Sequence, residues 1–194
     1  MAIKKFKDYI YIIQADLYRY DGATGVKNLL KKYIREPGFR YTFWMRTAGF
    51  LNTRLFLKVP YWLACFQLHR LEIKYGIIIP HTTEIGSGLF IGHFGGIVVN
   101  HRVSIGRNCN LSHGVTIGQK NRGKHKGYPK IGNSVFIGPG VSIIGSVSIG
   151  SNVAIGANAV VVHDVSNNEV VVGNPASKVS DKGATKYINY TLDD

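Results

Sequence analysis

Residues 131–165, IGNSVFIGPGVSIIGSVSIGSNVAIGANAVVVHDV, decide the fold. An aliphatic residue stands at every sixth position from Ile131 to Val161, and a valine or alanine follows four positions after each of them. Glycine directly follows most of these aliphatic residues, and it tolerates backbone angles that other residues avoid. A period of six matches neither an α-helix nor a β-hairpin, so it indicates a repeated unit of strand and turn.

The same period extends towards the N-terminus. It is present from Ile79 to Ile91 and resumes two residues late from Val99 to Ile117. Three such units make a triangular coil of about 18 residues whose aliphatic positions point inward, and stacked coils pair as parallel strands. This pattern resembles the left-handed parallel β-helix of hexapeptide-repeat proteins. We therefore predict an all-β left-handed parallel β-helix with a small N-terminal α-helical cap.

Charge and composition limit the class of protein. The chain carries 24 Lys and Arg against 11 Asp and Glu, a net charge of +13, which favours anionic partners. The sequence has no leader peptide pattern and no uncharged run long enough to span a membrane, and its two cysteines lie far apart. We expect a cytoplasmic protein without a nucleic-acid partner, and we leave contact with the inner face of the membrane open.

Residues 1–76 lack the hexapeptide period and have helical apolar spacing instead. They hold 14 of the basic residues against 5 acidic ones, mixed with aromatic residues. This mixture fits a cap that packs on the β-helix, and it also fits contact with an anionic membrane surface. We predict a helical cap at 1–76, a β-helix at 77–180 and a C-terminal tail at 181–194.

Residues 118–130, GQKNRGKHKGYPK, interrupt the repeat with a basic loop. The loop has no apolar periodicity, which fits a solvated excursion from the β-helix. Its five basic residues equally fit a loop that reaches over a neighbouring subunit or an anionic ligand. Both interpretations stay open at the level of sequence.

Two histidines fall at equivalent positions of neighbouring coils. His93 and His113 each stand two residues after an inward-facing position, Ile91 and Leu111. The two-residue slip before Val99 keeps these positions in phase, so the histidines should stack with about 5 Å between their backbones. An imidazole with a near-neutral pKa is suited to removing a proton from a hydroxyl that attacks a carbonyl.

Four stretches carry a closer resemblance. They are IGHFGGIVVN, NCNLSHGVTIGQ, GYPKIGNSVFIGPGVSIIGSVSIG and VVVGNPASKV, and together they resemble the serine acetyltransferase family of hexapeptide acyltransferases. The resemblance covers residues 76–180 closely and the cap only loosely. It implies that His93 is the general base, that acetyl-CoA donates the acetyl group, and that no metal takes part. It also implies a homotrimer with sites between subunits, enlarged further if the cap helices associate.

The sequence departs from the family at three places. Ile78 stands where the family has an Asp that orients the base, Gly92 replaces an Asp, and Gly127-Tyr128 replaces an Arg-His pair that holds the amino acid. Because serine carries two charged groups that need countercharges, we predict a sugar hydroxyl of surface-polysaccharide biosynthesis as the acceptor. The resemblance would then be closest to a short-cap branch of sugar acetyltransferases. The hydrogen-bonding residues expected to bind this acceptor are Asn100, His101, His113, His125 and Tyr128.

The resemblance also places the cofactor. Acyltransferases of this kind lay the pantetheine arm of acetyl-CoA along an edge of the coils, which corresponds to Gly138, Ala157 and His163 here. Lys178, after the GNPA motif, matches a basic position near the nucleotide phosphates, and a plain surface lysine is the alternative interpretation.

Three other functions remain open. Serine O-acetylation for cysteine biosynthesis is supported by the motifs and opposed by the replaced charged residues. A zinc site like that of β-helical carbonic anhydrases would need three histidines, and His93, His101 and His113 are the available set, although the spacing places His101 on another face. A trimeric scaffold without catalytic activity is the third.

Overall fold

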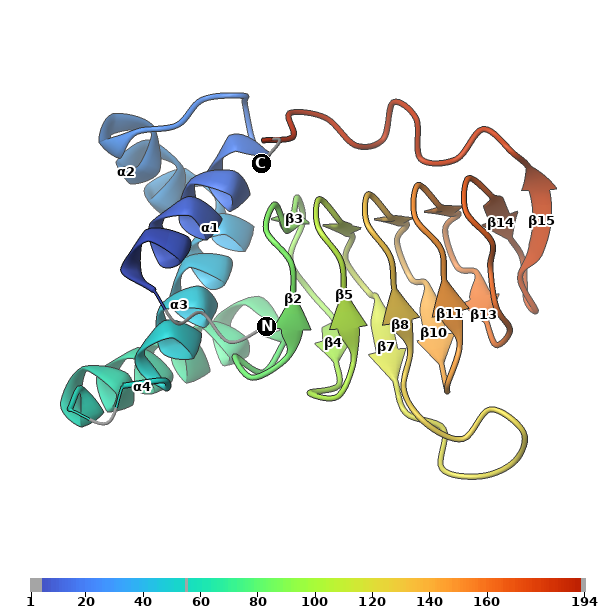
Figure 1. The fold of residues 1–194 in the computed structure, drawn as a ribbon, viewed down its shortest axis with the longest axis horizontal. Coiled ribbons are helices and arrows are strands. Elements are labelled where there is room, and N and C mark those ends of the chain that lie inside the picture. Colours follow the sequence, from blue (N-terminus) through green and yellow to red (C-terminus); the bar gives the residue numbers. More distant parts are fainter. Residues whose placement is uncertain (1–4, 55, 193–194) are drawn as a thin grey trace.

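The structure, a computed structural model, describes residues 5–54 and 56–192. Four helices form one end of the molecule, and a column of short strands extends away from them (Figure 1). Most strands pair in parallel with the strand three places further along the chain, so the strands make three sheets. The chain therefore winds as a three-sided parallel β-helix with an N-terminal helical region.

Each side of the β-helix is one sheet. Sheet A contains β1 (Ile77–Ile78), β4 (Ile97–Val99), β7 (Thr116–Gly118), β10 (Ser142–Ile144) and β13 (Val160–Val161). Sheet B contains β2 (Glu84–Ile85), β5 (Ser104–Ile105), β8 (Lys130–Ile131) and β11 (Ser148–Ile149). Sheet C contains β3 (Phe90–Ile91), β6 (Asn110–Leu111), β9 (Phe136–Ile137), β12 (Ala154–Ile155), β14 (Val170–Val172) and the antiparallel β15 (Ser177–Ser180). We name the three edges of the β-helix by the sheets that the chain joins there: A–B, B–C and C–A.

The hexapeptide positions form the core. Ile91, Leu111 and Ile137 pair in register along sheet C, and each is at most 1% exposed. The two additional residues of the slip lie in the turn before β4 and in β4 itself, where Ile97 and Val99 both face inward. This column of aliphatic side chains is the main hydrophobic core and accounts for most of the apolar burial of the β-helix.

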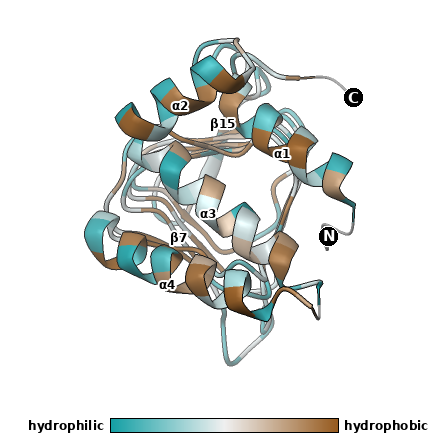
Figure 2. Ribbon diagram, turned by 90° about the vertical axis from the view of Figure 1, so that its left-hand side faces the viewer, coloured by the Kyte–Doolittle hydropathy of each residue, from teal (hydrophilic) through white to brown (hydrophobic). Residues whose placement is uncertain are grey.

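The helical region contains α1 (Phe6–Tyr18), α2 (Val26–Arg35), α3 (Pro37–Leu51) and α4 (Lys58–Tyr75). Helix α3 lies between α2 and α4 when the molecule is viewed from the helical end (Figure 2). Two prolines lie in first turns, Pro37 in α3 and Pro60 in α4, where their missing N–H groups would have no helical partner. Helix α4 begins at Lys58 and therefore includes Pro60. Among the described helices, none is long and apolar enough to cross a membrane.

A buried ion pair joins the helices to the first coil. Arg46 of α3 donates from Nε to Oδ2 of Asp16 in α1 at 2.9 Å, and the two side chains are 5% and 0% exposed. Arg46 also donates to the carbonyl oxygens of Ile85 and Gly86, and Asp16 accepts from the N–H of Leu89. Since Ile85 ends β2 and Gly86 and Leu89 lie in the turn that leads to β3, this network fixes the helical region on the β-helix.

The chain after β15 returns along the β-helix to the helical region (Figure 1). The ring of Tyr187 stacks on Phe136 of sheet C with 4.4 Å between centroids. Asn110 donates to the carbonyl oxygen of Tyr187, and Arg19, directly after α1, donates to that of Asn189, both at 2.9 Å. The described part of the predicted tail is therefore bound over sheet C.

Candidate active site

His93 and His113 lie together on the C–A edge. His93 follows β3, His113 follows β6, and both side chains are exposed. The ring centroids are 6.2 Å apart and the ring planes meet at 79°. The structure thus brings together the two histidines that the repeat predicts to stack. No described residue makes a hydrogen bond to the His93 ring, and Ile78, at the position of the family Asp, is 49% exposed.

A column of glycines shapes this edge. Gly96, Gly114 and Gly140 all have positive φ, and their backbones lie so close that a Cβ on Gly96 would be 3.4 Å from Cα of Gly114. The turns are joined by hydrogen bonds from Gly114 N to Gly95 O and from Gly140 N to His113 O. Each histidine therefore stands on a turn that is held by the turns of adjacent coils.

The helical region supports the backbone beside His93. The hydroxyl of Tyr20 donates to the carbonyl oxygen of Ile91 at 3.0 Å, and burial raises the pKa of Tyr20. Gly38 packs on the same carbonyl, which a Cβ at this position would overlap. Tyr75 of α4 contacts the ring of Phe94 with 5.4 Å between centroids. These contacts join segments that are far apart in the chain, so they leave no local sequence pattern.

The remaining acceptor candidates lie on the A–B edge. Asn100 and His101 follow β4, and the Asn100 side chain accepts a hydrogen bond from Arg102 N within its own turn. Arg102 lies over the ring of Tyr128, which precedes β8, at 5.4 Å. Within one subunit, these residues are on a different edge from His93.

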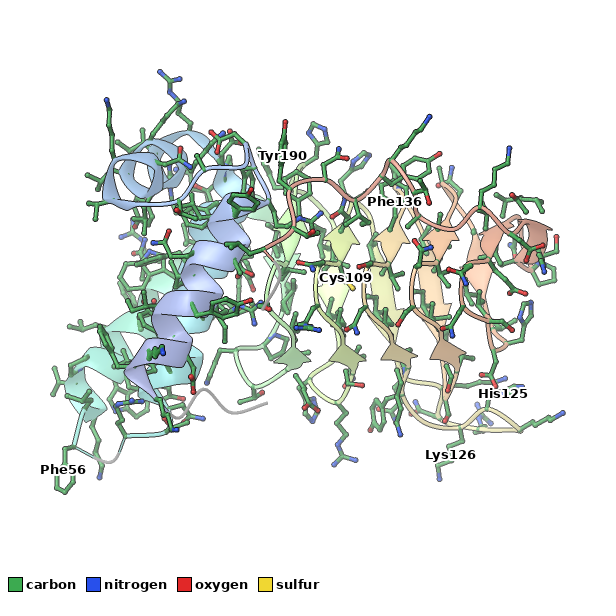
Figure 3. The ribbon with its side chains drawn as sticks, turned by 45° about the horizontal axis from the view of Figure 1, so that its top comes forward. Phe56, Cys109, His125, Lys126, Phe136 and Tyr190 are labelled. Atoms are coloured by element: carbon green, nitrogen blue, oxygen red, sulfur yellow. The ribbon has the colours of Figure 1, made fainter. Side chains whose placement is uncertain are left out.

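The basic loop folds back on the same A–B edge. Lys120 and Gly127 exchange backbone hydrogen bonds, and the carbonyl oxygen of His125 accepts from Ser146 N between β10 and β11. Figure 3 shows His125 and Lys126 on the side of the β-helix away from Phe136 and the returning tail. The loop therefore does not bring His125 to His93 within one chain.

The cofactor candidates divide in the same way. Gly138 and Ala157 follow β9 and β12 on the C–A edge, in the same column of turns as His93. His163 lies on the A–B edge, where hydrogen bonds to the carbonyl oxygens of Asp164 and Ala176 raise its pKa. Lys178 in β15 is paired with Asp181 and Glu169, and its bond to Asp181 raises its pKa. The negative charges of Asp181 and Glu169 reduce the positive charge that Lys178 would present to a phosphate.

The described part of the chain contains no group of three or more His, Cys, Asp or Glu side chains that could hold a metal ion. His101 lies on the A–B edge, whereas His93 and His113 lie on the C–A edge. The three histidines of the zinc hypothesis are therefore not brought together within one subunit.

Comparison with known proteins gives the family. Residues 128–163 match the family model described as bacterial transferase hexapeptide (six repeats). The chain is 35% identical over 154 residues to a serine acetyltransferase of Helicobacter pylori, with 79% of this chain and 88% of the relative covered. The crystal structure of serine acetyltransferase from Brucella abortus strain S19 has a TM-score of 0.76 and 27% identity, over 93% of this chain and 72% of that one. The crystal structure of Neisseria gonorrhoeae serine acetyltransferase in complex with serine has a TM-score of 0.70 and 32% identity, over 90% of this chain and 70% of that one.

The parallel β-helix and the match to the bacterial transferase hexapeptide model define a hexapeptide-repeat transferase. More narrowly, the chain belongs to the serine acetyltransferase family. It is an acetyltransferase whose acyl donor is acetyl-CoA, which confirms the prediction of the enzyme class and its co-substrate. The family match implies left-handed winding of the coils.

The prediction of a sugar acceptor in polysaccharide biosynthesis is wrong. The relatives and structural neighbours reported above are serine acetyltransferases, and no finding supports a glycan partner. The prediction assumed that countercharges for serine must stand at positions 92, 127 and 128, but other residues can supply charges to a small zwitterion. The short cap does not mark a separate branch either, because this chain covers 88% of the H. pylori serine acetyltransferase.

Proposed function

We propose that the chain is a serine O-acetyltransferase of cysteine biosynthesis. The observation that carries the proposal is the 35% identity to a serine acetyltransferase across nearly all of that protein's length. The neighbouring His93 and His113 give this chain an exposed base on the edge where the family resemblance places it. A cytoplasmic location and the division at residues 76 and 180 remain part of this proposal.

His93 acts as the general base. It takes the proton of the serine hydroxyl while the oxygen attacks the carbonyl carbon of the acetyl thioester. The C–S bond then breaks, and the CoA sulfur leaves with the proton that His93 has held. The pantetheine arm lies along the C–A edge, where backbone groups of Gly138 and Ala157 line the same column of turns. Lys178 contributes little to phosphate binding because two carboxylates already pair with it.

The complete site forms between subunits of a trimer. Sheet C is covered by the returning tail, and the outward residues of sheet B include Glu84, Lys130 and Ser148. Sheet A exposes the adjacent apolar residues Ile78 and Val98, which are 49% and 41% exposed. Packing of sheet A around a threefold axis would bring the C–A edge of one subunit to the A–B edge of the next. His93 and the residues around Tyr128 would then face one cleft.

We expect L-serine to be an efficient acceptor. With acetyl-CoA and L-serine, release of the CoA thiol should be saturable, with a Michaelis constant in the range of about 1 μM–1 mM that is usual for natural substrates. L-alanine is the matched control, because it has both charged groups and lacks the hydroxyl. The proposal is wrong if thiol release with L-serine does not exceed release with L-alanine.

The shared site predicts complementation between two defective chains. His93→Ala removes the base on the C–A edge, and His101→Ala/Tyr128→Ala alters the A–B edge. Every trimer that contains both chains has one interface at which both edges are intact, so about a third of its sites should be restored. The measurement is thiol release by trimers purified through a different tag on each co-expressed chain. Mixed trimers that are no more active than the two parents would show that each site lies within one subunit.

A further inference from the structure

A pocket of about 310 Å³ lies in the helical region, apart from the residues assigned to acetyl transfer. Its lining residues come from the last turn of α2, the first turn of α3 and the C-terminal half of α4. The lining residues are Tyr33, Arg40, Gln67, Arg70, Leu71 and Lys74. Gln67, Arg70, Leu71 and Lys74 stand at helical spacing on α4, so one face of that helix supplies four of the six lining residues.

The pocket is strongly basic. Three of its six lining residues are cations and none is a carboxylate. The surrounding segment, 26–75, contains ten basic residues and only two acidic ones. Both acids are engaged elsewhere, Glu36 with Lys32 at 3.6 Å and Glu72 with His69 at 3.3 Å. An anion in this pocket would therefore meet positive charge without a competing carboxylate from the wall.

The hydrogen-bond donors of the pocket are incompletely used. The hydroxyl oxygen of Tyr33 accepts from Trp44 Nε1 at 2.8 Å, which leaves its own proton free to donate. Arg70 and Gln67 make no hydrogen bond or ion pair with any described residue. The lining thus offers many donors, and the amide oxygen of Gln67 is one of the few acceptors.

Arg40 is held in place before any ligand arrives. Its Nε donates to the carbonyl oxygen of Tyr33 at 2.6 Å, one Nη donates to the hydroxyl of Tyr75 at 2.7 Å, and the other donates to the carbonyl oxygen of Ile34. A guanidinium has five N–H groups, so two remain. A fixed guanidinium loses little conformational entropy on binding, which favours a ligand that matches its planar geometry.

We propose that this pocket is a binding site for a phosphate group, either free phosphate or a small phosphate monoester. Arginine pairs bidentately with phosphate oxygens, and Lys74 adds a point charge. The doubly charged oxyanion accepts the unused hydrogen bonds of Tyr33, Arg40 and Arg70. A volume near the lower end of the range for small-molecule sites, about 300–1,000 Å³, leaves room for a short esterified group.

The test compares two double variants with the same change in charge. Arg70→Gln/Lys74→Gln removes two cations from the pocket, and Lys27→Gln/Lys31→Gln removes two from exposed positions on α2 outside it. Wild type should gain about 2–4 °C in melting temperature in about 10 mM phosphate, relative to chloride at equal ionic strength. The α2 variant should keep this gain and the pocket variant should lose it. Calorimetric titration should show phosphate affinity at least tenfold weaker for the pocket variant alone.

Two arms separate the ligands. Inorganic phosphate and glycerol 3-phosphate are titrated in parallel. A higher affinity for glycerol 3-phosphate identifies a phosphate monoester as the ligand. An equal or lower affinity identifies free phosphate. Equal stabilisation of both double variants would overturn the proposal, because it would show a general effect of charge. No stabilisation of the wild type would overturn it as well. Neither result depends on the acceptor of the acetyl group, since the readout is binding to the unreacted enzyme.

Discussion

Replacement of His93 by alanine is expected to lower turnover with acetyl-CoA and L-serine by about 10²–10⁴-fold. The variant loses the group that takes the hydroxyl proton as the oxygen attacks the thioester. Because the side chain is exposed and makes no hydrogen bond with a described residue, its removal should leave the fold intact. CoA affinity, measured by calorimetry, should stay close to that of the wild type, so the loss should appear in kcat.

His69→Ala is the matched control for this experiment. His69 is an exposed histidine on α4 whose ring lies 3.3 Å from Glu72, and it is not on either edge that carries the candidate site. Its loss should not change turnover. Turnover close to wild type in the His93 variant would place the base elsewhere, and His113, with its ring centroid 6.2 Å away, would be the next residue to replace.

Replacement of Asp16 by alanine is expected to lower the free energy of unfolding by about 3–5 kcal/mol. The substitution leaves the guanidinium of Arg46 buried without its carboxylate, and it leaves the N–H of Leu89 without its acceptor. Since this network ties α1 and α3 to the first coil, the loss should affect the joint between the helices and the β-helix. Urea unfolding followed by circular dichroism is the measurement.

Two further variants bracket this result. Asp16→Asn removes the charge and replaces one acceptor oxygen by an NH2 group, but it keeps an oxygen for Leu89, so its loss should be smaller than that of the alanine variant. Asp181→Ala breaks an exposed pair with Lys178 and should have little effect, because solvent screens such pairs. A loss below about 1 kcal/mol for Asp16→Ala would show that Arg46 is compensated by other groups.

The residues of the candidate site are divided between two edges of one subunit. His93, His113, Gly138 and Ala157 lie on the C–A edge, whereas His101 and Tyr128 lie on the A–B edge. A single sheet separates these edges, so one chain cannot close a cleft around an acceptor from both of them. This division is the structural reason for placing the active site between subunits, and the complementation experiment tests it directly.

The prediction of the acceptor shows the limit of reasoning from single positions. Gly92, Gly127 and Tyr128 were interpreted as lost countercharges, and a sugar was inferred from their absence. The relatives are serine acetyltransferases, so the sugar inferred from these three positions is not supported. Recognition of a zwitterion depends on where charges meet in space. Charges from a loop or a neighbouring subunit are invisible at the aligned positions.

The sequence by itself determined the β-helix. A period of six, with Ile or Val inward at each repeat, is local information, because every coil repeats the same few contacts with the next. For the same reason counting alone, with the slip before Val99 included, places His93 and His113 at equivalent positions of adjacent coils. The motifs around His93 were enough to identify the enzyme class and acetyl-CoA.

Only the tertiary structure decided how the helical region meets this β-helix. The Asp16–Arg46 pair, the bond from Tyr20 to Ile91 and the return of the tail to Arg19 each join residues far apart in the chain. Such contacts have no period, and the residue types involved are individually common, so no pattern of spacing reveals them. The basic pocket arises in the same way, because Arg40 and Arg70 become neighbours only when α3 and α4 pack together.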